Sequence, residues 1–274
     1  MRYQKINPSP QLAPFVVCYF VWENHTPLLQ PLRIESPPSG FASIVFNYGD
    51  GYHVRTEKSN RSAPVAFLTG QSTHQYELEL TGRIGMIGIV FKPAGLSSLF
   101  GLPMYEFSDE RILLTDALGS GHERQTAAFL GEQIADCTTD ASRVAVLDDF
   151  LNRQLLRRGN RFDRTDYVAN LIVDKRGVLN VNELENELYV CRRQFERQFL
   201  QKVGVSPKYY ARIRRVGYLC AELAAKRWHI TDWQDLIYQC GYYDQSHFIK
   251  DFTQFTGKRP TVYLKDNAEL TQYL

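Results

Sequence analysis

The sequence has no apolar run long enough to cross a bilayer and no recognisable signal peptide. Its longest uncharged apolar stretch near the start is the eight-residue run Phe15–Trp22, whereas a spanning helix needs about 20 residues. Residues 1–4 lead into no apolar segment with a small-residue cleavage site. We therefore expect a cytoplasmic protein without membrane contact.

Cysteine is scarce and widely spaced, with no Cys-x-x-Cys pair. The five residues are Cys18, Cys137, Cys191, Cys220 and Cys240. An odd number at these spacings predicts neither a disulfide framework nor a structural zinc site. We expect free thiols in packed surroundings. The alternative for Cys191 is a reactive thiol whose pKa is depressed by Arg192 and Arg193.

The sequence also lacks the motifs of common enzymes. It has no Gly-x-Ser-x-Gly, no Walker loop and no Gly-x-Gly-x-x-Gly. A metal-binding β-barrel enzyme needs clustered His and Glu ligands, but His25, His53 and His74 are scattered. We expect no catalysis, no metal and no cofactor.

Charge is balanced over the whole chain but not along it. The net charge is +2, from 32 Lys and Arg and 30 Asp and Glu. Residues 160–274 hold 18 basic and 14 acidic residues, whereas residues 1–159 hold 14 and 16. Between Cys191 and Arg215, eight basic residues stand with one acidic residue, Glu196. Such a surface suits a phosphate backbone, and an ordinary solvated helix face is the alternative.

The first part of the chain has the pattern of a β domain followed by helices. Short apolar, β-branched segments lie at 15–22, 42–47, 63–69, 76–80 and 84–91, with turn residues at 37–40, 48–51 and 81–83. Helical spacing begins near residue 117 and is interrupted at 138–140. The apolar stripe Val144–Leu155 predicts a helix face that either mediates dimerisation or covers the β domain.

Everything after residue 161 has helical spacing, with a boundary at 159–161. The expected helices span about 166–176, 180–189, 191–202, 207–223, 233–239 and 244–255. A short helix pair occurs twice. Both copies end on Gly-x-x-Pro, at Gly204–Pro207 and Gly257–Pro260, which lie 53 residues apart. The sequence therefore predicts an internal repeat of two helix pairs joined by one long helix.

Two helix–turn–helix pairs joined by a long helix resemble the DNA-binding domain of the AraC/XylS family. The segments Gly241–Phe252 and Thr256–Tyr263 are similar to the family signature, and Leu184–Pro207 resembles its first unit. The resemblance covers about residues 165–264. Cys191 stands where the family usually has a capping serine, which predicts a weaker cap because sulfur is a poor hydrogen-bond acceptor.

The resemblance implies an α+β two-domain transcription regulator that binds double-stranded DNA sequence-specifically. Family members commonly place a cupin-like effector-binding or dimerising domain first, and residues 1–159 are similar to it, β-rich to about 116 and helical at 117–159. This domain is expected to be a β-barrel or sandwich with trailing helices. Residues 160–274 are expected to form the all-α domain of two helix-turn-helix units joined by a long helix. The implied partners are RNA polymerase, a second copy of the chain and an unknown small-molecule effector.

The resemblance also implies which side chains contact DNA. Base contacts are expected from Arg193, Glu196, Arg197, Gln245, Ser246, His247, Ile249 and Lys250. Phosphate contacts are expected from Arg192, Lys202, Lys208, Arg212, Arg215 and Lys258. Arginine binds guanine with two hydrogen bonds, and Ile249 fits a thymine methyl group. The alternatives are an intrahelical partner role for Glu196 and ordinary surface exposure for Ile249.

For the N-terminal half, aromatic side chains suggest a pocket for an aromatic or amphiphilic effector. They are Trp22, Phe46, Tyr48, His53 and Tyr76. The alternative is that these are core aromatics. Two functions stay open: control by a small molecule, or an N-terminal half that binds a protein partner or only dimerises. An enclosed apolar cavity would favour the first, and a filled barrel with an exposed apolar helix the second. A third, an enzyme with an appended DNA-binding domain, would carry a metal or cofactor.

Overall fold

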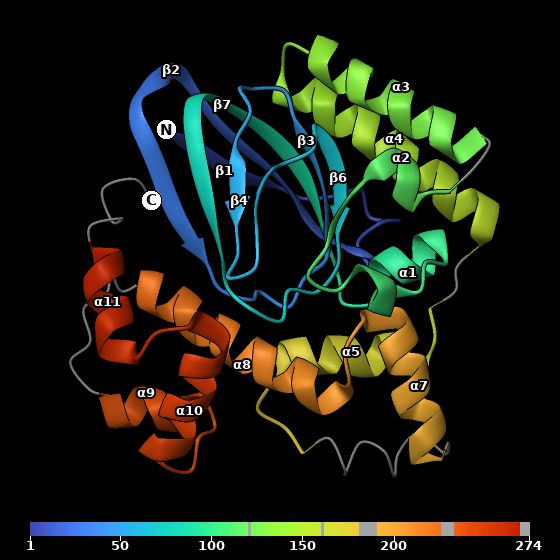
Figure 1. Cartoon of the computed structure of the whole chain (residues 1–274). Coiled ribbons are helices and arrows are strands. Elements are labelled where there is room, and N and C mark those ends of the chain that lie inside the picture. The colour runs from blue at the N-terminus through green and yellow to red at the C-terminus, as the bar shows by residue number, and fades with distance from the viewer. Residues whose placement is uncertain (120–121, 160–161, 181–190, 226–232, 269–274) are drawn as a thin grey trace.

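The computed structural model describes residues 1–119, 122–159, 162–180, 191–225 and 233–268. An antiparallel β-sheet domain forms the N-terminal part and rests on a layer of helices formed by the C-terminal part (Figure 1). This confirms the predicted α+β fold with its order of strands first and helices last. The second expected helix, at about 180–189, lies outside the described residues except for Asn180.

The described part of the β domain contains one antiparallel sheet of eight strands. They are β1 Arg2–Ile6, β2 Val16–Ser36, β3 Ser43–Asn47, β4 His53–Arg55, β5 Asn60–Ser62, β6 Ala66–Thr69, β7 Tyr76–Phe91 and β8 Arg111–Leu113. The strand order is β1-β2-β7-β3-β6-β8, and the β4–β5 hairpin pairs with β7 through β4. The long antiparallel pair of β2 and β7 is therefore the main structural element of the sheet.

The turn expected at 81–83 is not a turn, because the strands expected on either side of it are one strand, β7. Gly82 lies at its middle with a φ of +63° and pairs with Leu28 of β2. The register shifts on both sides of Leu28. The glycine marks a bulge at which the long strand pair bends, a use of glycine inside strands that sequence alone confuses with a turn.

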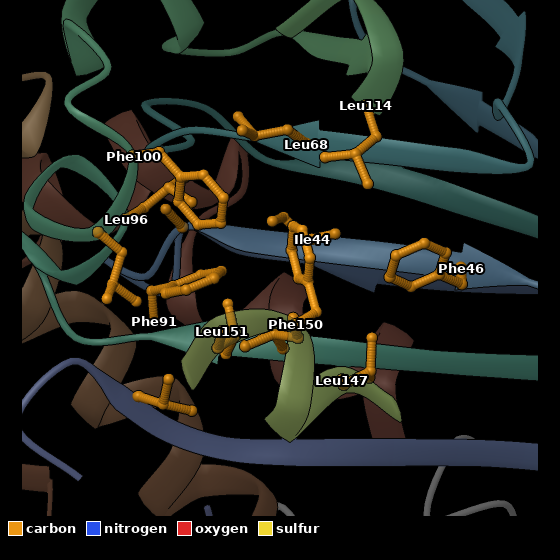
Figure 2. Packing of buried hydrophobic residues seen from close by; sticks show 14 of the residues in the cluster. Ile44, Phe46, Leu68, Phe91, Leu96, Phe100, Leu114, Leu147, Phe150 and Leu151 are labelled. Carbon is orange, nitrogen blue, oxygen red and sulfur yellow. The ribbon is translucent and has the colours of Figure 1, made fainter. Parts of the chain in front are cut away.

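The two faces of the sheet carry two separate apolar cores, because side chains alternate along each strand. On β3, Ile44 and Phe46 pack toward the helices, whereas Val45 belongs to the core on the other face. Figure 2 shows Leu147, Phe150 and Leu151 reaching the first core from helix α4. Leu147 and Leu151 are fully buried there. The predicted apolar stripe thus covers the sheet, which was one of the two roles expected for it.

Helices complete both parts. The first group is α1 Gly95–Phe100, the 3-10 turn η1 Met104–Phe107, α2 Leu114–Ala117, α3 His122–Asp136 and α4 Asp140–Arg158. The second group is α5 Arg164–Asp174, α7 Arg192–Val203, α8 Pro207–Ala225, α9 Trp233–Gln239, α10 Gln245–Thr256 and α11 Pro260–Ala268. Thr139 caps α4 with a capping box, which explains the predicted break at 138–140. Among the described helices, none is both long and apolar enough to span a membrane.

Candidate nucleic-acid interface

The helices α7 and α10 are the second helices of the two repeated pairs, and both bury an aromatic face. Phe195 and Phe199 of α7 and Phe248, Phe252 and Phe255 of α10 are at most 2% exposed. Their shared core is completed by Tyr210, Ile213, Val216 and Leu223 of the long helix α8. Figure 1 shows α7 and α10 on opposite sides of α8, in the layer away from the β-sheet. The two helices therefore pack on α8 through apolar faces of the same kind, in agreement with the predicted internal repeat.

The polar sides of α7 and α10 point to solvent. Arg193 and Arg197 are exposed on α7, and Gln245, Ser246 and Lys250 are exposed on α10. No other element covers them in the described part of the chain. Each helix thus presents a polar surface on a firmly packed apolar base, which is the arrangement that a helix needs to enter a major groove.

The two helices begin differently. The Asp244 side chain accepts a hydrogen bond from the His247 N–H at 2.7 Å and caps α10. Cys191 occupies the equivalent position of α7 and forms no side-chain cap hydrogen bond. Cys191 is exposed, so the thiol is accessible. This agrees with the weaker cap predicted from cysteine at this position.

Three predicted base-contact residues also make contacts inside the protein. Glu196 Oε1 accepts a hydrogen bond from Arg192 Nε at 3.0 Å, the intrahelical pairing that was the alternative for this residue. Ile249 is half-buried against the helical core, so only part of its side chain faces solvent. His247 is half-exposed, and its Nε2 lies 3.9 Å from Asp251 Oδ2.

Four of the six side chains that were predicted to contact phosphate form ion pairs or hydrogen bonds within the protein. Lys202 Nζ lies 2.8 Å from Asp163 and 2.5 Å from the buried Asp166. Lys258 pairs with Glu35 of the β domain. Arg215 donates to the carbonyls of Gly177 and Gly241 and thereby holds two turns. Arg212, the fourth, pairs with Asp251. Of the other two, Lys208 is exposed and Arg192 pairs with Glu196, and the phosphate contacts stay a prediction for all six residues.

Arg212 of α8 and Asp251 of α10 form an ion pair on the buried side of α10. Arg212 Nη2 lies 2.7 Å from Asp251 Oδ1, and Arg212 Nε contacts both carboxylate oxygens at 3.2 and 3.3 Å. Asp251 is only 2% exposed. Its hydrogen bonds hold the pKa of the Arg212 guanidinium above the ordinary value. A buried carboxylate of this kind depends on its cation, because an unpaired buried charge is costly.

Both candidate DNA-contacting helices rest their C-terminal ends on the β domain. Gly204 ends α7, and its carbonyl accepts a hydrogen bond from Ser108 Oγ at 3.0 Å. Gly257 ends α10, and a Cβ there would lie 2.7 Å from Gln75 Nε2. Both glycines have positive φ, the conformation in which helices commonly end. The distance between the two helices is therefore set by the β domain as well as by α8.

A third contact joins the β domain to the middle of α8. The Tyr210 hydroxyl donates to the Gly40 carbonyl at 2.7 Å, and Arg214 donates to the Ser39 carbonyl and stacks over the Phe41 ring at 4.2 Å. Burial lowers the pKa of Arg214 from its ordinary value. The loop that contains Gly40 thus seats the β domain on the long helix.

The five residues predicted to line an effector pocket do not come together. Phe46 and Tyr48 pack on the sheet face that the helices cover, whereas Trp22 and Tyr76 belong to the core on the opposite face. His53 is exposed. The strand register decides the face on which each side chain lies, and the aromatic character of these residues does not reveal that register.

A cavity of about 530 Å³ lies elsewhere, beside the β4–β5 hairpin, and of the predicted pocket residues only Tyr76 lines it. Its other walls include Arg111 of β8 and Gln254 of α10. The cavity is therefore formed by both domains. Its lining is largely polar, whereas the sequence predicted an aromatic, enclosed pocket.

Sequence reasoning missed Asp251, Gln254 and Arg111. Asp251 had a readable signal, because an acidic residue at the spacing of Phe248, Phe252 and Phe255 must lie on the buried face and requires a cation. No local pattern marks Gln254 or Arg111. Arg111 stacks over Tyr76 and Gln254 accepts a hydrogen bond from Arg212, residues 35 and 42 positions away that local spacing does not relate to them.

Two sequence families match the chain. The N-terminal match is a domain of unknown function (DUF6597) over residues 4–113, and the C-terminal match is a helix-turn-helix domain over residues 184–266. No curated protein matches the chain.

Several solved structures are similar to the chain at low identity. ToxT from Vibrio cholerae is 14% identical, with 89% of this chain and 97% of that chain covered and a TM-score of 0.46. A ToxT from Vibrio cholerae strain SCE256 with bound unsaturated fatty acid is 13% identical, with 89% and 94% covered and a TM-score of 0.45. The AraC-like transcriptional activator CuxR is 12% identical, with 80% and 85% covered and a TM-score of 0.28.

The buried aromatic faces of α7 and α10, their outward polar sides and the helix-turn-helix match all describe the same segment. The chain is therefore a transcription regulator with a C-terminal helix-turn-helix domain of the AraC type, preceded by a domain whose family has no known function.

Proposed function

We propose that the regulator binds one DNA duplex with α7 and α10 in successive major grooves, and that a small molecule bound by the β domain controls this binding. The main observation in support is that both helices pack on α8 and expose their polar sides to solvent. Residues 160–274 form the DNA-binding part, and residues 1–159 form the regulatory part. RNA polymerase is the proposed partner of the bound regulator.

Within this proposal, α7 reads bases with Arg193 and Arg197, and α10 reads them with Gln245, Ser246 and Lys250. All five side chains are exposed. An arginine that donates two hydrogen bonds to guanine gives about 1–3 kcal/mol of discrimination against the wrong base. Lys208, exposed near the start of α8, is the phosphate contact that positions the protein without specifying sequence.

The test compares Arg197→Ala with Lys208→Ala on duplexes selected by the wild-type protein. We expect Arg197→Ala to relax the base preference at one position. We expect Lys208→Ala to weaken binding evenly and to reduce the slope of log affinity against log salt by about one unit. The matched control is Lys5→Ala, an exposed lysine on β1 in the β domain. Identical effects of Arg197→Ala and Lys208→Ala on every sequence would refute the assigned roles.

Control by a small molecule is favoured by the cavity at the junction of the two domains. A second candidate, an N-terminal half that associates with another copy, is supported by two exposed apolar side chains on the helices that cover the sheet. Phe129 of α3 is 58% exposed, and Leu156 of α4 is 84% exposed. Sedimentation of the wild type and of a Phe129→Ser, Leu156→Ser variant separates the two candidates. A wild-type dimer that the variant loses would support association through these helices.

A further inference from the structure

The cavity between the domains has the size of a small-molecule site. Its volume is about 530 Å³, within the usual range of about 300–1,000 Å³ for ligand pockets. The β4–β5 hairpin, residues 72–76 and residues 109–111 form the walls on the β domain. Gln254 of α10 forms the remaining wall. A bound molecule would therefore contact both the regulatory domain and one of the two candidate DNA-contacting helices.

The lining contains three basic side chains, Lys58, Arg61 and Arg111, and three acidic ones, Glu57, Asp109 and Glu110, and of these six Arg111 alone is half-buried. Its half-buried guanidinium stacks over the Tyr76 ring at 4.0 Å, and no carboxylate lies within 4 Å of it in the part of the chain that the structure describes. The neighbouring Asp109 is already bound by the Thr73 N–H at 2.6 Å and by the Thr73 hydroxyl. The Tyr76 ring holds the half-buried guanidinium of Arg111 in place. Its planar N–H donors can therefore bind an anion through two hydrogen bonds.

The rest of the lining defines the ligand further. Lys58 and Arg61 are exposed at the rim, where the exposed carboxylates of Glu57 and Glu110 balance their charge, so the half-buried Arg111 is the cation inside the cavity. Most lining residues are polar or charged, and the aliphatic ones are Val54, Ala63 and Pro64. A long hydrocarbon chain would find little apolar wall to cover it. The lining therefore fits a small polar organic anion, with Ser62 and Ser72 available as hydrogen-bonding partners.

The same walls hold the C-terminal end of α10. Gln75 lines the cavity and also packs against Gly257, and its Oε1 is buried without a hydrogen-bond partner. Gln254 Oε1 accepts a hydrogen bond from Arg212 Nη2 at 2.6 Å. The Tyr209 hydroxyl of α8 lies 3.5 Å from the Thr73 carbonyl. In contrast, α7 is seated on η1 and Ser108, which are outside the cavity.

We propose that this cavity is the effector site, that its ligand is a small organic anion held by Arg111, and that binding changes how α10 is held against the β domain. Ligand binding changes the preference for the bases that α10 contacts, because α7 contacts the β domain outside the cavity. This inference rests on the proposed function, since it identifies the effector class and the helix that responds.

The first experiment measures binding of citrate, a small polar organic anion, by calorimetry at constant ionic strength. We expect the wild type to bind, and Arg111→Gln to bind at least about tenfold more weakly, the equivalent of one lost charge-assisted hydrogen bond. The control is Arg83→Gln, an exposed arginine outside the cavity, which should bind as the wild type does. No binding by the wild type, or equal binding by Arg111→Gln, would overturn the proposal.

The second experiment measures base preference of the full chain with and without citrate. We expect citrate to change the preference in the part of the site that Lys250→Ala affects, and we expect Gln254→Ala to abolish this change while citrate still binds. Sequence-specific binding that citrate leaves unaltered overturns this inference and leaves the proposed function intact. Loss of sequence-specific binding under every condition overturns the proposed function, whereas the calorimetric result for Arg111 stands independently.

Discussion

The helices α7 and α10 pack in the same way but differ in their N-terminal caps and in the polar residues that they bury. Both bury phenylalanines at helical spacing, and both end at a glycine with positive φ that rests on the β domain. They differ at the start, where Asp244 caps α10 and Cys191 leaves α7 without a side-chain cap. They also differ on the buried side, because α10 contains the buried carboxylate of Asp251.

This difference separates what the fold requires from what can vary. The aromatic face and the terminal glycine recur because each helix must pack on α8 and end where it meets the β domain. The cap and the buried carboxylate affect only how firmly each helix is held. Exposed arginines are concentrated on α7, whereas α10 is tied to its surroundings by Arg212 and by the cavity wall at Gln254.

The largest effect should come from removing the cation beneath α10. Arg212→Ala leaves the carboxylate of Asp251 buried and unpaired, so we expect the free energy of unfolding to fall by about 3 kcal/mol. Urea denaturation measures this change. The control is Arg192→Ala, which breaks the exposed pair with Glu196 and should cost less than about 1 kcal/mol. Equal losses from both variants would show that the pair under α10 is not special.

The next effect tests the cap of α10. Asp244→Ala removes the acceptor of the His247 N–H, and we expect a loss of about 1 kcal/mol in the free energy of unfolding. Asp244→Asn keeps a capping oxygen and should retain most of the stability. If asparagine proves as harmful as alanine, the carboxylate matters for a reason other than capping.

The smallest effect is a gain at the start of α7. Cys191→Ser supplies the hydroxyl that the helix lacks, so thermal or urea unfolding should show stabilisation of about 0.5–1 kcal/mol. Cys191→Ala should change stability little, because the thiol makes no cap hydrogen bond. A serine variant no more stable than the alanine variant would mean that α7 does not need a cap, and the comparison with α10 would lose its meaning.

The sequence was sufficient to predict features that depend on local spacing. The helices α7, α8 and α10 and the helix ends at Gly204 and Gly257 follow from periodicity and capping preferences. The break before α4 at Thr139 is another such feature. In each case the relevant contacts lie within a few residues along the chain.

Features that depend on pairing between distant segments were not predicted. The turn expected at 81–83 is a bulge, because β2 supplies a partner along the whole of β7. The expected pocket fails because Phe46 and Trp22 point to opposite faces. Lys202 and Lys258 looked like free surface cations, but Asp166 and Glu35 neutralise them from other elements. Net charge along the chain does not reveal which charges are already paired.

The most direct test is selection of DNA from a random duplex library by the wild type, Arg197→Ala and Lys250→Ala. If α7 and α10 enter successive grooves, each variant should lose base preference in a different part of the site, with the two parts about 10 base pairs apart. Loss of preference in the same part of the site, or no loss in either variant, would contradict binding of one duplex by both helices.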